Sequence, residues 1–144
     1  MPHVPVGTLI DIFSVLGALF AVWKGGVAER SAAIVVIANV LIGQTEWFAP
    51  GSGGLIRIIN DGITALVLLV ITVRYAALWM GGVMLFFAAQ FSMHSYYLVT
   101  ERPNDYWHAL INNIDYSGII WCLIIGTLVA WRARSRRRRV APAT

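Results

Sequence analysis

The sequence predicts an all-α fold, a polytopic bundle of five transmembrane helices. Of its 144 residues, 58% are hydrophobic and 12% are charged, and the mean hydropathy is +0.71. Because a soluble domain of this size carries about 25% charged residues, the chain has too little charge to cover a water-exposed surface. Five apolar runs are each close to the ~17–25 residues that cross a hydrocarbon core as a helix. These runs are residues 6–23, 31–48, 55–73, 76–98 and 109–131.

Polar or turn-forming segments mark the break after each run. Residues 24–30 combine charge with two glycines, and residues 49–54 are rich in glycine. Residues 74–75 divide an apolar stretch that is too long for one span, and residues 100–105 form the last break. Tryptophans stand near the predicted span ends, as in the aromatic belts of membrane interfaces. They are Trp23, Trp47, Trp79, Trp107 and Trp131.

The first run is the weakest of the five spans. It contains Asp11, and a carboxylate inside a span is costly. An interfacial helix is therefore the alternative for this run, which leaves four spans. The run is not preceded by the basic region of a cleavable signal peptide, so we expect it to be retained. Residues 1–131 then form the bundle, and residues 132–144 form a basic tail.

The distribution of positive charge predicts the orientation of the bundle. Six arginines crowd the tail, while Lys24, Arg30 and Arg74 lie in the first and third breaks. The positive-inside rule places all of these in the cytoplasm and the N-terminus outside. Polybasic segments beside a span bind anionic lipid headgroups, and this binding explains the tail without any nucleic acid. The residues expected to bind headgroups are Arg132, Arg134, Arg136, Arg137, Arg138 and Arg139.

Acidic and imidazole side chains gather in the outer halves of the predicted spans. At 1.5 Å per residue, Asp61 and Asp115 lie about 8–9 Å below the outer span ends, with His94 somewhat shallower. Charged groups at this depth normally face a bundle interior or water. Converging helices then form one outward-facing layer for a cation, a proton or a polar ligand; the alternative is a set of structural interhelical hydrogen bonds. The candidates are Asp61, Asp115, Glu46, His94, Asp11, Arg57 and Gln90.

No catalytic or metal-binding motif accompanies this layer. Carboxylates with one imidazole suit a divalent ion, but no HExxH, CxxC or paired-histidine spacing is present, so a metal stays open. Only His94 lies clearly inside a span, which argues against bis-histidine haem. Ser92 and His94 point to different helix faces and form no catalytic dyad. We expect no enzymatic activity, and the sequence identifies no cofactor.

The last span carries a small residue at every fourth position. Such stripes allow close approach of helix backbones in lipid. The pattern does not specify whether the partner helix belongs to this chain or to another. Plausible mates are Ser14, Ala18 and Ala21 in the first run, and Asn39 with Gly43 in the second. The members of the stripe are Gly118, Cys122, Gly126 and Ala130.

Several short motifs resemble a group of small, uncharacterised multi-span proteins of alphaproteobacteria. They are RYAALW at residues 74–79, QFSMH at residues 90–94, and Ile-Trp at residues 120–121 before an arginine-rich end. The WKGG with Glu-Arg at residues 23–30 resembles the same group, whereas residues 112–115 depart from it. The resemblance implies a bacterial inner membrane and no particular activity.

Two functions fit these observations. The first is a non-enzymatic inner-membrane protein that acts in a homo-oligomer or as an accessory subunit of a larger membrane complex. It is favoured by the small size, the small-residue stripe and the lack of catalytic motifs. The alternative is a small cation or proton channel or transporter that uses the outward-facing carboxylate–His layer, with Arg57 as a counter-charge. The expected partners are anionic membrane lipids and either a second copy or another membrane protein, and not nucleic acid.

Overall fold

The chain folds into five α-helices. The computed structural model describes residues 6–43, 53–103 and 105–140, and these residues contain no strand, so the all-α prediction is confirmed. The helices are α1 (Val6–Lys24), α2 (Val27–Gly43), α3 (Gly53–Tyr75), α4 (Leu78–Val99) and α5 (Tyr106–Val140).

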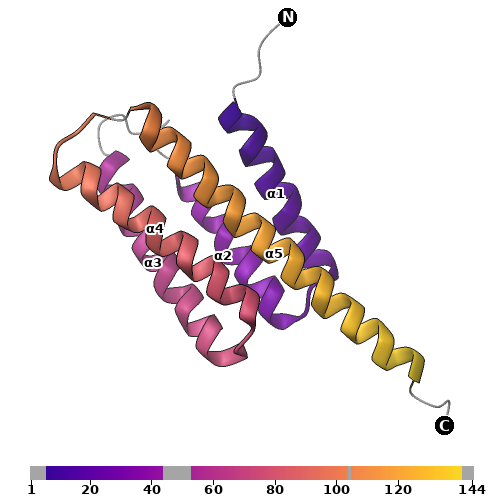
Figure 1. The fold of residues 1–144 in the computed structure, drawn as a ribbon. Coiled ribbons are helices and arrows are strands. Elements are labelled where there is room, and N and C mark those ends of the chain that lie inside the picture. The colour runs from indigo at the N-terminus through magenta and orange to yellow at the C-terminus, as the bar shows by residue number, and fades with distance from the viewer. Residues whose placement is uncertain (1–5, 44–52, 104, 141–144) are drawn as a thin grey trace, which may run out of the picture.

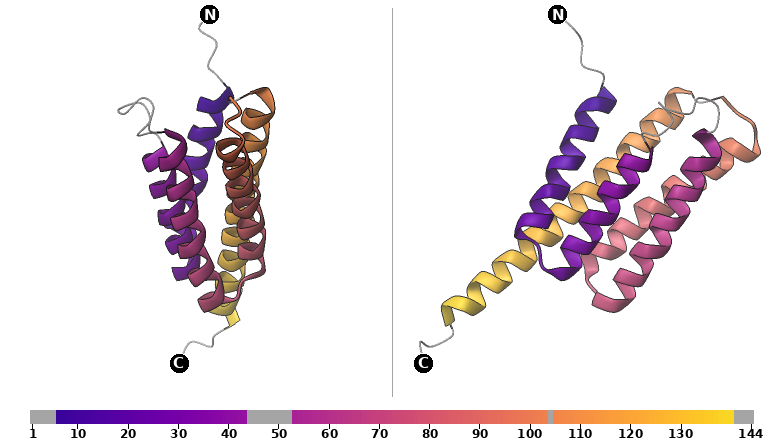
Figure 2. Two further views of the ribbon diagram at one scale, coloured as in Figure 1. Left: turned by 90° about the vertical axis from the view of Figure 1, so that its left-hand side faces the viewer. Right: turned by 180° about the vertical axis from the view of Figure 1, so that it is seen from behind.

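The helices lie side by side, and each packs on the next one along the chain (Figure 1). α5 also packs on α1, which closes the five helices into a ring, and α2 touches α5 across it. Successive helices run in opposite directions, so residues 25–26 and 76–77 both lie at the end where α5 leaves the bundle (Figure 2). We call this the tail end. The opposite end, with residues 100–103 and the starts of α1 and α5, is the loop end.

Helices α1, α3 and α4 begin and end within two residues of the predicted spans. α2 begins at Val27, four residues before its predicted span, and the predicted end at residue 48 lies outside the described residues. The early start has a local cause. The Glu29 carboxylate accepts a hydrogen bond of 2.7 Å from the Gly26 amide, so it caps the first turn. Charges that resemble a loop in the sequence therefore belong to a helix start.

The last helix is longer than its predicted span. Asp105 Oδ1 accepts a hydrogen bond of 2.9 Å from the His108 amide, which is the geometry of an N-cap and fixes the start of α5. From Tyr106 the helix continues for 35 residues to Val140, or about 52 Å. The arginines beyond residue 131 therefore lie on α5, outside the bundle at the tail end (Figure 1).

Two of the helices are long and apolar enough to cross a membrane. They are α3 over Leu55–Tyr75 and α5 over Tyr106–Arg139. The segment Ile12–Lys24 of α1 is apolar but shorter. The structure thus supports a helical protein that can associate with a membrane, while the five-span arrangement stays a prediction.

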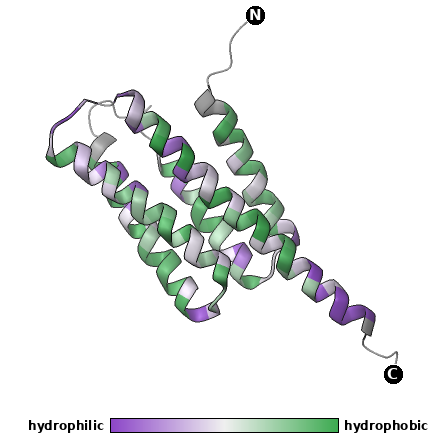
Figure 3. Ribbon diagram, viewed as in Figure 1, coloured by the Kyte–Doolittle hydropathy of each residue, from purple (hydrophilic) through white to green (hydrophobic). Residues whose placement is uncertain are grey.

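The described side chains are arranged with many apolar groups outside and many polar groups inside. Leu16, Ile63 and Val129 are about 60% exposed, at 60%, 58% and 63%, whereas Asp61, His94 and Asp115 are each at most 7% exposed. Hydrophilic residues otherwise concentrate at the two ends of the bundle (Figure 3). A water-soluble monomer rarely exposes such contiguous apolar surface, but lipid tails match it.

The small-residue stripe of α5 packs against α4 of the same chain. A Cβ atom added to Gly118 would overlap the Phe86 ring, and one added to Gly126 would overlap the Trp79 ring. Between them, a Cβ on Gly82 would lie 2.7 Å from the Cys122 sulfur. Half-buried Ala130 lies one turn beyond this ladder. The question that the sequence left open is thus answered for three of the four stripe residues by a partner within the chain.

α1 approaches another face of α5 in the same manner. A Cβ on Gly17 would lie 2.7 Å from Ile120 Cγ2, and Ser14, Ala18 and Ala21 are each at most 1% exposed. Small residues therefore hold α5 close to two neighbours. The largest buried apolar side chains fill the space between the helices: Phe87, Leu68, Met80, Ile119, Ile120 and Leu123.

We expect Gly126→Ala to destabilise the bundle by about 1–3 kcal/mol, the usual cost of overpacking. The new methyl would overlap Trp79 Cγ, the ring atom next to Cβ, so the indole cannot turn away within its rotamer. Gly81→Ala is the matched control, because a Cβ there meets nothing within 4 Å. Unfolding in detergent micelles, followed by circular dichroism, measures both. Equal stability of the two variants would contradict the close packing of α5 on α4.

Ala76, in the connection between α3 and α4, has a left-handed backbone with φ of 47°. Its amide still donates to the Thr72 carbonyl at 2.8 Å, so it closes α3 in the position where glycine is common. An L side chain costs about 1–2 kcal/mol in this region. The next residue, Ala77, has an extended backbone with φ of −91°.

Ala76→Gly should therefore raise the free energy of unfolding by up to about 1 kcal/mol. Ala77→Gly is the control in the same connection, since its φ is ordinary and glycine gains nothing there. It should leave stability unchanged or lower it. The same detergent unfolding assay compares the two, and a loss of stability in Ala76→Gly would refute the left-handed backbone at this position.

Candidate functional site

A hydrogen-bonded carboxylate–imidazole pair lies in the loop-end half of the bundle. His94 Nδ1 of α4 is 2.6 Å from Asp61 Oδ2 of α3. Asp61 is 4% exposed and His94 is 7% exposed. Two predicted candidates from different helices thus meet inside the bundle, where a short charge-assisted bond is strong.

Asn39 of α2 connects this pair to α2 and α5. Its side-chain nitrogen donates to Asp61 Oδ1 and to Thr64 Oγ1, both at 3.1 Å. Its side-chain oxygen accepts a hydrogen bond of 2.6 Å from the Tyr116 hydroxyl of α5. Its backbone carbonyl accepts a bond of 3.0 Å from the Asn60 side chain. One amide therefore joins α2, α3 and α5 around the carboxylate.

The hydrogen bonds around Asp61 determine which nitrogen of His94 carries the proton. An ionised carboxylate only accepts hydrogen bonds, so His94 Nδ1 donates to Asp61. In the neutral ring, Nε2 is then an acceptor. That nitrogen is buried and has no hydrogen-bond partner among the described residues. Asp61 positions the ring, and Nε2 of His94 is the atom left to take a proton.

A polar cavity of about 100 Å³ adjoins the pair, and residues of all five helices line it. It extends toward the loop end, to Gly43 at the end of α2 and Arg57 near the start of α3. Its volume and many polar atoms suit water molecules. The lining residues are Ile10, Asn39, Val40, Gly43, Arg57, Asn60, Asp61, Gln90, His94, Asn112, Asn113 and Tyr116.

Two further buried polar atoms near the cavity have no hydrogen-bond partner in the described part of the chain. They are Oε1 of Gln90, whose nitrogen donates to Asn112 Oδ1 at 3.2 Å, and Oδ2 of Asp115. Asp115 is 5% exposed and lies close enough to His94 for their charges to interact. Leaving such atoms unpaired costs free energy, so they mark places where water or a ligand acts.

The predicted layer is therefore largely assembled. Asp61, His94, Gln90 and Arg57 line one cavity, and Asp115 lies beside His94. Glu46 lies outside the described residues, as does the side chain of Asp11.

Three residues of the site were not predicted as such from the sequence: Asn39, Thr64 and Tyr116. Asn39 carried a usable signal, because it is a lone amide within the apolar half of α2, and polar groups within spans seek partners. Thr64 and Tyr116 carried none, since both fit an ordinary apolar span.

A second polar group links the pair to the loop end. The His94 and His108 ring centroids are 5.2 Å apart, and those of His108 and Tyr97 are 4.8 Å apart. The Tyr97 hydroxyl donates to Asp105 Oδ1 at 2.6 Å. This hydrogen bond has the largest effect in holding the pKa of Asp105 below its usual value, and the hydrogen bond from the His108 amide has the next largest.

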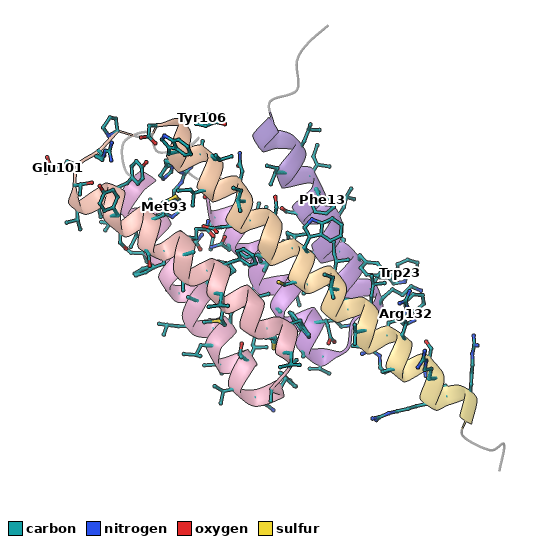
Figure 4. The ribbon with its side chains drawn as sticks, in the orientation of Figure 1. Phe13, Trp23, Met93, Glu101, Tyr106 and Arg132 are labelled. Atoms are coloured by element: carbon teal, nitrogen blue, oxygen red, sulfur yellow. The ribbon has the colours of Figure 1, made fainter. Side chains whose placement is uncertain are left out.

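Glu101 and Tyr106, at this end of the bundle, lie far from Trp23 and Arg132 (Figure 4).

The tail arginines divide between two faces of α5. Arg134 and Arg138 line a cavity shared with the α1–α2 connection. Arg132, Arg136 and Arg139 line another one beside it. Within the described residues, no group of three or more His, Cys, Asp or Glu side chains could hold a metal ion.

The chain matches no protein-family model, no curated protein and no solved structure. A helical bundle hosts many functions, so the chemistry of the site has to indicate this one.

Tyr97→Phe should raise the pKa of Asp105, because it removes the strongest hydrogen bond to the carboxylate. Since the pKa in the folded protein is lowered, Asp105 stabilises the fold above the unfolded value of about 3.9, and this contribution is lost as the pH falls through the folded pKa. The variant should therefore lose stability at a higher pH on acidification. The carboxyl ¹³C shift of Asp105 against pH measures the change. Tyr96→Phe, on the adjacent exposed tyrosine, should leave that pKa unchanged; equal curves for both variants would exclude the role of Tyr97.

Proposed function

We propose that this chain is a multi-pass protein of the bacterial inner membrane that transports protons through the Asp61–His94 pair. The observation that carries the proposal is the state of His94: Nδ1 bonds to a buried carboxylate, while Nε2 has no protein partner beside a polar cavity. Histidine changes charge near neutral pH. Ionisable groups inside transmembrane bundles typically belong to ion or proton paths.

The membrane placement is supported by the outside of the bundle. α3 and α5 meet the length and hydropathy of a membrane span, and the other three helices lie beside them with ends at similar levels (Figure 2). α2, the shortest at 17 residues, is about 25 Å long, close to the ~30 Å of a hydrocarbon core. If α3 and α5 cross a bilayer, their neighbours in the ring cross with them. Lys24, Arg30 and Arg74 then share the tail end with the α5 arginines, which places that end in the cytoplasm.

A proton fits the site better than a metal cation. Each oxygen of Asp61 already accepts one hydrogen bond, from His94 and from Asn39, and no group of three or more His, Cys, Asp or Glu side chains among the described residues could hold a metal ion. The atoms with spare capacity are Nε2 of His94 and Oδ2 of Asp115. When Nε2 takes a proton, the imidazolium is stabilised by the hydrogen-bonded Asp61 carboxylate and by the charge of Asp115 nearby. In this proposal the predicted carboxylate–His layer consists of one proton-accepting imidazole and two carboxylates that stabilise its protonated form.

The apolar core separates this site from the tail end. Leu68 and Phe87 are each seven residues from Asp61 and His94 toward the tail end, which is about 10 Å, and both are at most 1% exposed. The cavity extends toward the loop end instead. A carrier alternates between states in which its site is reached from only one side. The described arrangement corresponds to the state in which protons reach His94 from the loop end.

The role in a homo-oligomer or as an accessory subunit is less well supported. It depended on a small-residue stripe that could bind a second chain, and the glycines of that stripe pack on Phe86 and Trp79 of α4. No enzymatic step is proposed.

Arg57 lines the cavity near its loop end, where it acts as a counter-charge to the carboxylates.

Proteoliposomes test the proposal. A pH-sensitive dye inside the vesicles reports proton uptake driven by a potassium diffusion potential. The wild-type protein should conduct, and His94→Gln should reduce the flux to the leak of protein-free vesicles, because the proton-accepting nitrogen is gone. Asp61→Asn should lower the flux strongly while His94 is still present, since the carboxylate charge that stabilises the protonated ring is lost.

Glu101→Gln is the matched control, because it removes an exposed carboxylate at the loop end that does not line the cavity. It should conduct like the wild type. Circular dichroism of each reconstituted variant verifies that the helices are retained. Wild-type flux equal to the leak, or full flux in folded His94→Gln, would overturn the proposal.

A further inference from the structure

Another polar cavity lies at the tail end, between the α1–α2 connection and the extension of α5. Its volume is about 220 Å³. Four cationic side chains from α1, α2 and α5 line it, and two tryptophans flank them. These are Lys24, Arg30, Arg134, Arg138, Trp23 and Trp131.

Arg134 fixes the α5 extension to the start of α2. Its Nη2 donates to the Lys24 backbone carbonyl at 2.7 Å, and its Nη1 is 3.8 Å from Glu29 Oε2. Glu29 is 6% exposed and also accepts the Gly26 amide. A Cβ on Gly26 would lie 2.8 Å from Arg134 Nη1, so the guanidinium lies close against this part of the backbone. The cavity wall is thus an ordered contact between segments 110 residues apart.

The charge of this cavity is unbalanced. Four cations face one carboxylate, that of Glu29, and the Gly26 amide and Arg134 already engage it. The excess charge of +3 favours an anion. The Lys24 ammonium lies 3.8 Å from the centroid of the Trp23 ring and 5.4 Å from that of Trp131. Cation–π contacts therefore hold it between the two indoles.

The two indoles indicate a lipid as the source of that anion. Trp23 is 71% exposed and Trp131 is 40% exposed, and tryptophans at span ends lie at the level of the headgroups. The ligand thus has an anionic head and an apolar body. An excess of three positive charges matches two phosphodiesters better than one.

We propose that this tail-end cavity binds the headgroup of an anionic phospholipid with two phosphates. Basic pockets between helices on the cytoplasmic side are typical sites for such headgroups. Lys24, Arg30 and Arg138 contact the phosphates, while Arg134 holds the wall in place. The inference rests on the membrane placement proposed above and not on proton transport.

Native mass spectrometry of the full-length protein in mild detergent tests this site. The protein is titrated with diphosphatidylglycerol, phosphatidylglycerol and phosphatidylethanolamine, and the wild type should retain the first most strongly. Arg30→Gln combined with Arg138→Gln should weaken its binding about 30-fold, from two basic contacts. Neither residue takes part in the contact of Arg134 with Glu29, so the wall is preserved.

The control combines Arg74→Gln with Arg137→Gln. It removes one arginine from the last turn of α3 and one from α5 at the same end, and neither lines this cavity. Its binding should stay within about threefold of the wild type. If the first double variant unfolds in detergent, Arg138→Gln alone, a substitution on the exposed end of α5, replaces it.

Three results would overturn the proposal. Equal losses in the two double variants would show diffuse attraction by the tail. Displacement of the lipid by equimolar inorganic pyrophosphate would assign the cavity to a free phosphate compound. Equal retention of phosphatidylethanolamine and diphosphatidylglycerol would exclude a site for an anionic headgroup and leave the membrane placement standing. Retention of no phospholipid at all is a separate outcome, which would count against the membrane placement itself.

Discussion

A bundle with an apolar exterior has to satisfy its polar side chains from within, and the Asp61–His94 hydrogen bond is where this constraint is strongest. Between helices in lipid, apolar contact is weakly directional, because lipid tails are as apolar as the helices. Hydrogen bonds are directional. Asn39, Asp61, His94 and Tyr116 come from four different helices, so their bonds fix the rotation of each helix relative to the others. The ring arrangement depends on this one network.

The same network is incomplete on one side, and that incompleteness distinguishes a site from a structural element. A purely structural network would satisfy every buried atom. Here both oxygens of Asp61 are hydrogen-bonded, while Nε2 of His94, Oε1 of Gln90 and Oδ2 of Asp115 are buried without partners in the described residues. Each such atom costs about 1–3 kcal/mol. His94 and Gln90 line the cavity and Asp115 lies near His94, where water can satisfy these atoms.

The sequence was sufficient to predict how deep each polar residue lies within its span, but not which neighbouring helix its side chain faces. Asp61, His94 and Gln90 could be placed in one layer because 1.5 Å per residue converts chain position into depth within a span. Asn39 was missed because its role depends on which neighbour its helix face meets, and the apolar residues around it form no stripe that fixes that face. The start of α2 was placed four residues late for a related reason. Glu29 resembles a loop charge in the sequence, but its carboxylate caps the first turn by accepting the Gly26 amide, and Arg134 lies beside it.

α5 connects the two sites of the molecule. Tyr116 contributes a hydrogen bond to the network in the loop-end half, and Arg134 holds the wall of the tail-end cavity. Between them, Gly126 and Gly118 fit so closely against α4 that the helices cannot approach further. Exposing His94 to the tail end requires the apolar core around Phe87 to open, and α5 can contribute only by moving away from α4 or sliding along it. Such a movement would strain the contact of Arg134 with the α1–α2 connection. Under the two proposals above, a lipid that bridges Arg30 and Arg138 would oppose this opening, and its release would favour it.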